Sequence, residues 1–111
     1  MTWLDEIRIE LGRAHEAQRV GNESRVRVCA RRAAGIAVAE LSKHRSEYQH
    51  SGSIMEQLAS FGSNTRAPRS ARQAASRLAA RLNEKFVSPS KNPVDDALII
   101  ITFVQQSLKQ S

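Results

Sequence analysis

Apolar residues recur at three- and four-residue spacing in four separate stretches of this 111-residue chain, which is the pattern of amphipathic α-helices. The stretches run from Thr2 to Gln18, from Asn22 to Lys43, from Pro68 to Lys85 and from Asn92 to Leu108. A shorter repeat of Ile54, Leu58 and Phe61 predicts one further helix of two or three turns. The sequence therefore predicts an all-α fold, a compact bundle of four main helices plus one short helix.

The composition indicates how such a bundle is filled. Hydrophobic residues make up 41% of the chain but aromatic residues only 5%, so the core must consist mainly of Ala, Leu, Ile and Val. The residues around Gly35 in the second stretch have small side chains, so a helix there would be thin. This pattern predicts a central helix with closely packed neighbours. The length matches one ordinary domain, so we expect residues 1–111 to form a single helical-bundle domain.

The last stretch contains an ambiguity between helix and strand. Residues 99–104 are all good strand formers, yet no second strand candidate exists with which they could pair. Asn92 as a cap, Pro93 in the first turn and Asp95 near the positive helix end favour a helix.

The net charge of +6, carried mostly by arginine, indicates an acidic partner. Candidate partners are a nucleic acid, an anionic surface or an acidic protein. Arginine suits such partners because its planar guanidinium grips phosphate or carboxylate with two hydrogen bonds.

The stretch from Pro68 to Lys85 and the turn before it concentrate this charge. The candidate anion-binding residues are Arg66, Arg69, Arg72, Arg77, Arg81 and Lys85. A helical wheel places Arg69, Arg77 and Arg81 opposite the apolar side, so we expect an exposed basic stripe of roughly 20 Å. An ordinary solvated helix face explains the same pattern equally well. Aromatic residues are absent from the stripe, so base stacking is not expected.

Four arginines at the start of the second stretch have a structural explanation. Arg25, Arg27, Arg31 and Arg32 are expected to form ion pairs with acids of the first stretch. Those acids are Asp5, Glu6, Glu10 and Glu16. Surface pairs of this kind contribute at most about 1 kcal/mol each.

The polar stretch around residues 44–53 offers the one candidate for catalysis. Arg45 and His50 are the residue types that metal-free RNA cleavage requires, with His as general acid or base. A solvated loop accounts for them more simply. The three histidines lack a supporting cysteine or carboxylate pattern, so neither a metal site nor a cofactor is predicted. The single cysteine, Cys29, is interpreted as a small core residue.

No signal peptide or membrane span is visible in the sequence. The longest uncharged apolar run, residues 97–104, is less than half of the roughly 20 residues that a span requires. We therefore expect no membrane association and a cytoplasmic location.

Two segments give the chain a family resemblance. The Arg- and Ala-rich stretch from Arg25 to Glu40, followed by the stretch from Asn92 to Ile101, resembles the HEPN superfamily of small helical bundles. Many HEPN proteins are RNases or toxin-system components paired with a nucleotidyltransferase. The resemblance implies an active motif of Arg, four to six residues, then His, which Arg45 and His50 match in spacing. Ser46 stands where the family usually has Asn, Asp or His.

Three functions follow from these patterns. The sequence favours a non-enzymatic, HEPN-like binding module that engages a nucleic acid or an acidic protein through Arg-rich helix faces. The enzymatic alternative is a metal-free RNase that uses Arg45 and His50. The third is a structural homo-oligomer, such as a homodimer, with Ala-rich faces as subunit contacts.

Overall fold

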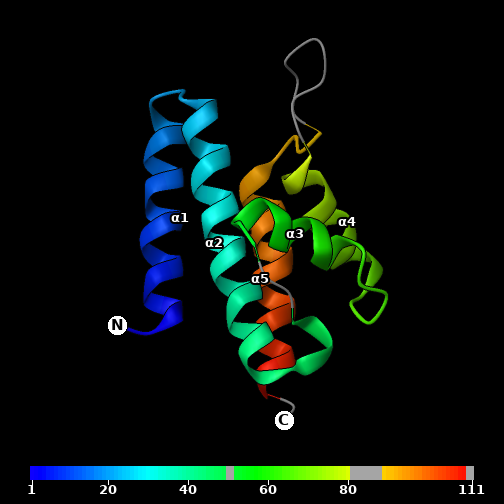
Figure 1. Cartoon of the computed structure of the whole chain (residues 1–111). Coiled ribbons are helices and arrows are strands. Elements are labelled where there is room, and N and C mark those ends of the chain that lie inside the picture. The colour runs from blue at the N-terminus through cyan, green and yellow to red at the C-terminus, as the bar shows by residue number, and fades with distance from the viewer. Residues whose placement is uncertain (50–51, 81–88, 110–111) are drawn as a thin grey trace.

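The computed structural model describes residues 1–49, 52–80 and 89–109, and these residues form an all-α structure without strands. Its elements are α1 (Trp3–Arg19), α2 (Glu23–His44), the 3-10 turn η1 (Ser46–Tyr48), α3 (Ile54–Gly62), α4 (Arg69–Ala79) and α5 (Pro93–Lys109) (Figure 1). Residues 99–104 lie inside α5, so the helical prediction for them is confirmed. No helix in the described ranges is long and apolar enough to cross a membrane.

Side-chain caps fix where four of the helices begin. In each, a side-chain oxygen accepts a hydrogen bond from a backbone N–H three residues later. These caps are Thr2 on α1, Asn22 on α2, Ser53 on α3 and Asn92 on α5. The start of α4 differs, because Pro68 offers no side-chain cap.

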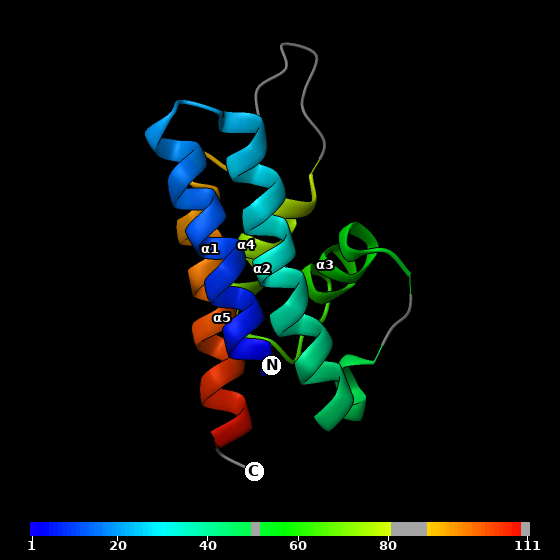
Figure 2. The same cartoon turned by 90° about the vertical axis from the view of Figure 1, so that its left-hand side faces the viewer.

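The second helix is the centre of the molecule. It contacts every other helix, and the figures show it between α1 and α3 in one view and between α5 and α3 in the other (Figures 1 and 2). Ala30, Ala33, Ala34 and Ala37 are fully buried on it. A Cβ atom on Gly35 would lie 2.8 Å from Cγ2 of Ile54 at the start of α3. The prediction of a thin, closely packed central helix is therefore confirmed.

Alanine and aliphatic side chains fill the core, as the composition predicts. The largest fully buried side chains include Leu41, Leu58, Leu78 and Ile100. Cys29 is 1% exposed in α2, which confirms its interpretation as a core residue.

A small aromatic cluster closes the end of the core near η1. The ring of Tyr48 lies 5.9 Å from that of Phe61 of α3 in a tilted arrangement and 6.3 Å from that of Phe103 of α5 edge to face, measured between ring centroids. The cluster thereby joins η1 and α3, which are consecutive, to α5 at the other end of the chain.

The fourth helix is shorter than predicted. We expected it to continue to Lys85, but α4 ends at Ala79 and Ala80 has extended backbone with ψ of 141°. Arg31 of α2 donates from Nε to the carbonyl of Leu78 at 2.7 Å and from Nη2 to that of Ala80 at 3.3 Å. The described residues contain five α-helices, as predicted in number, of which three have 17 to 22 residues and two have 9 and 11.

The predicted ion pairs between the first two helices are also wrong. The acids of α1 pair with arginines one turn away on the same helix, as in Glu10 with Arg13 at 2.7 Å and Glu16 with Arg19. Arg31 instead binds the end of α4, and burial lowers its pKa, with repulsion from Arg27 adding to the shift. Pairs within a helix need no particular tertiary geometry, which explains why the acids of α1 pair with arginines of their own helix.

Candidate anion-binding site

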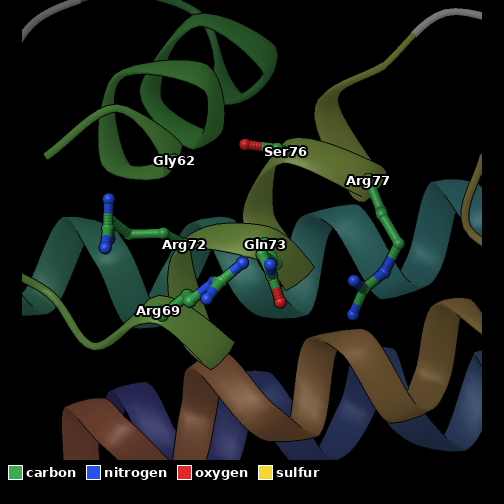
Figure 3. Close-up of a pocket in the computed structure, with 6 residues that line it drawn as sticks. All are labelled: Gly62, Arg69, Arg72, Gln73, Ser76 and Arg77. Carbon is green, nitrogen blue, oxygen red and sulfur yellow. The ribbon is translucent and has the colours of Figure 1, made fainter.

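The solvent-facing side of α4 forms an open groove of about 480 Å³, which we call the α4 groove (Figure 3). Its lining residues are Gly62, Arg69, Arg72, Gln73, Ser76 and Arg77. The five from α4 recur at three- and four-residue spacing, so they share one face of the helix. The opposite face carries Ala71, Ala74, Ala75 and Leu78, all buried, which confirms the predicted core side of this helix.

Arg72 forms one wall of the groove. Its Nε donates a hydrogen bond to the carbonyl oxygen of Ala67 at 3.1 Å, and the side chain is half-buried. Its Nη1 and Nη2 groups have no partner in the part of the chain that the structure describes. In Figure 3 the guanidinium lies on the side of the groove that faces Gly62.

Arg77 forms the opposite wall, where it binds α5. Its Nη2 donates to Oδ1 of Asp96 at 2.6 Å, its Nε lies 3.2 Å from both carboxylate oxygens, and the bond to Asp96 raises the pKa of Arg77. Asp96 is only 6% exposed and also accepts a hydrogen bond from the Ser90 hydroxyl at 2.6 Å. The expectation that Arg77 points freely into solvent is therefore wrong, although it still lines the groove.

Arg69 is the exposed arginine of the groove. No hydrogen bond or ion pair of its side chain occurs within the described ranges, and Figure 3 shows it extending along α4 toward Gln73. Its guanidinium is therefore available to an external anion.

The other lining residues of the groove, Gly62, Gln73 and Ser76, are uncharged. A Cβ atom on Gly62 would lie 2.5 Å from Oγ of Ser76, so the end of α3 approaches α4 closely beside the groove. Gln73 and Ser76 make no side-chain hydrogen bonds to other described residues. Sequence reasoning missed both because it searched for charge, although their spacing from Arg69 placed them on the same face.

The electrostatics of the groove are positive. None of its six lining residues is acidic, and the first turn of α4 contains no acid, unlike the first turns of the other four α-helices. Arg69 and Arg72 stand in that first turn, where the helix dipole adds positive potential. Even with Arg77 neutralised by Asp96, two arginine charges therefore face the groove.

The other predicted anion-binding residues do not join this site. Arg66 is exposed in the turn before α4 and its backbone N–H donates to Asn64 at 3.0 Å, but it does not line the groove. Arg81 and Lys85 lie outside the described residues, so the predicted 20 Å stripe is described only as far as Arg77.

The candidate catalytic pair is described in part. Arg45 donates from Nη2 to the carbonyl of Ser107 at 2.6 Å and so caps the end of α5, while His50 lies outside the described residues. His15 bonds to Gln18 and His44 to Glu40, each on its own helix. No group of three metal-ligating side chains occurs among the described residues.

Comparison with known proteins adds no assignment. No family model, curated protein or solved structure matches this chain. The chemistry of the α4 groove is therefore the basis for the functional argument.

Proposed function

We propose that this chain is a non-enzymatic helical-bundle module that binds the phosphate backbone of a nucleic acid through the α4 groove. The observation that carries the proposal is the pair of arginines without an ion-pair partner among the described residues, Arg69 and Arg72, in one groove whose lining contains no acid. Arg69 and Arg72 are one helical turn apart, about 4.5 Å along the axis, and their long side chains can reach neighbouring phosphates of one strand.

A nucleic acid fits this surface better than an acidic protein does. Protein interfaces depend on buried aromatic or aliphatic anchors at their centre, whereas protein–nucleic acid interfaces are polar and positively charged. The exposed residues of α4 are Arg69, Ser70, Gln73 and Ser76, all polar. The face offers hydrogen-bond donors but no apolar anchor.

The same composition predicts little sequence preference. Phosphate contacts position a nucleic acid without reading its bases, and the groove lining contains no aromatic ring on which a base could stack. We expect oligothymidylate and oligouridylate to bind with similar affinity.

A salt titration of a fluorescein-labelled oligothymidylate, followed by anisotropy, tests the proposal. Each phosphate contact on a single strand contributes about −0.7 to the slope of log K against log salt, so Arg69→Gln/Arg72→Gln should flatten the slope by about 1.4. The matched control is Arg25→Gln/Arg32→Gln, which removes the same charge from exposed positions on α2 and should retain most of the slope.

Three results would contradict the proposal. They are no binding by the wild type at low salt, an equal loss in the control variant, and tighter binding of polyglutamate than of oligothymidylate. The last would favour an acidic protein as partner.

Three further predictions from the sequence also remain untested. A HEPN-like ancestry, a cytoplasmic location and homodimer formation remain proposals. The RNase alternative has less support, because capping of α5 already accounts for the Arg45 side chain.

A further inference from the structure

The three arginines of the α4 groove differ in how their guanidinium groups are held. Arg77 is bound to a buried carboxylate, and Arg69 has no bond to another described residue that fixes its side chain. Arg72 alone is held by a neutral group, the carbonyl of Ala67. The position of the Arg72 side chain is therefore fixed, while no acid in the part of the chain that the structure describes compensates its charge.

The group that holds Arg72 is itself fixed. Ala67 is 3% exposed, and its N–H donates to the carbonyl of Asn64 at 3.0 Å. The Nδ2 of Asn64 in turn donates to the carbonyl of Glu47 beside the 3-10 turn at 2.8 Å. These bonds connect the turn before α4 to the body of the molecule, so the acceptor for Arg72 Nε has a defined place.

The remaining donors of Arg72 form a fork. A guanidinium has five N–H donors in one plane, and with Nε occupied the four on Nη1 and Nη2 remain. Two of them point side by side along the end of the group, in the spacing that matches two oxygens of one phosphate. On Arg77 the edge formed by Nε and Nη2 is already occupied by Asp96.

We propose that Arg72 is the residue that anchors the nucleic acid, binding two non-bridging oxygens of one phosphodiester through Nη1 and Nη2. Arg69 contributes electrostatic attraction for the phosphate, but its side chain has no fixed orientation. Arg77, bound to Asp96, forms the opposite wall of the groove. This inference rests on the proposed nucleic-acid function. Because Arg72 is pre-organised by Ala67, it loses little conformational freedom on binding.

Charge-conserving substitutions separate these roles. Arg72→Lys and Arg69→Lys both keep the positive charge, so neither should change the salt slope for oligothymidylate. Arg72→Lys loses the fork and should weaken binding by about tenfold, whereas Arg69→Lys should weaken it less than about twofold. Equal losses, or a larger loss for Arg69→Lys, would overturn the inference while wild-type binding still upheld the proposed function.

A measurement on the wild-type protein tests the same inference even if Arg72→Lys fails to fold. In an NMR titration with unlabelled oligothymidylate, the Nη resonances of Arg72 should shift and broaden more than those of Arg69. Shifts confined to Arg69 would refute the anchoring role. Absence of any binding would instead refute the proposed function itself.

Discussion

At the scale of single residues, the arginines of this chain fall into two groups that the sequence does not distinguish. Arg31 of α2 and Arg45, the residue after α2, donate to carbonyls at the ends of α4 and α5, and Arg77 binds Asp96. Arg69 has no such partner among the described residues. Arginine therefore serves here as an internal connector as well as a surface charge, because one side chain can donate to several acceptors at once.

The ion pair between Arg77 and Asp96 gives a prediction of stability. Arg77→Ala leaves the buried Asp96 carboxylate without its cation, so we expect the free energy of unfolding to fall by about 2–3 kcal/mol in urea denaturation. Arg69→Ala, the matched control on the same helix, should change it by less than about 0.5 kcal/mol. Equal effects of the two variants would show that the pair contributes nothing.

Removing both charges provides a second check. The double variant Arg77→Ala/Asp96→Ala should recover part of the lost stability, since no buried charge is then left unpaired. A strictly additive loss would contradict this explanation.

At the scale of helices, most of the fold follows from sequence patterns, and the exceptions have physical causes. Periodicity and capping residues predicted the start of every α-helix to within a few residues. The end of α4 was missed because Leu82 and Phe86 continue the apolar repeat, while Ala80 leaves helical backbone where Arg31 binds. That contact joins residues 49 positions apart, which no local pattern contains.

The candidate site, like the fold, could be predicted only in part from the sequence. The face that carries Arg69 and Arg72 followed from the 3.6-residue repeat. The partner of Arg77 did not, because Asp95 and Asp96 are equally suited to the first turn of α5 from sequence alone. Only the packing of α4 against α5 selects Asp96 as the buried acid.

The contact between α2 and α3 gives a prediction at this scale. Alanine is a better helix former than glycine by about 1 kcal/mol, yet a Cβ at position 35 would lie 2.8 Å from Ile54. Gly35→Ala should therefore lower the free energy of unfolding by about 1 kcal/mol or more in the wild-type background. In an Ile54→Ala background the same change should raise it, which a double-mutant cycle by chemical denaturation would detect. The same sign in both backgrounds would exclude Ile54 as the cause.

At the scale of the whole molecule, the aromatic cluster connects the 3-10 turn, α3 and α5. Tyr48 is the chain's single tyrosine and is 7% exposed. Burial raises the pKa of its phenol, the nearby Glu47 adds to the shift, and Arg66 and Arg45 oppose it. The neutral phenol is therefore favoured in the folded state.

This raised pKa predicts loss of stability in alkali. In the unfolded chain the phenol ionises near its ordinary pKa of 10.0, so its contribution is fully present below that pH. The contribution is then lost as the pH rises through the folded-state pKa. Ultraviolet absorbance should show tyrosinate forming above pH 10.0 in the folded protein, and Tyr48→Phe should reduce the alkaline decline in stability. A titration midpoint at or below the ordinary value would contradict the prediction.

The central position of α2 has a consequence for how this sequence can change over evolutionary time. This helix contacts all four other α-helices and its alanines at the centre are fully buried, so a larger side chain at one of those positions would have to displace a neighbour. Such changes should persist only when a compensating reduction arises elsewhere, as the contact of Gly35 with Ile54 illustrates. Related sequences should therefore vary in pairs of positions, one on α2 and one on a neighbouring helix.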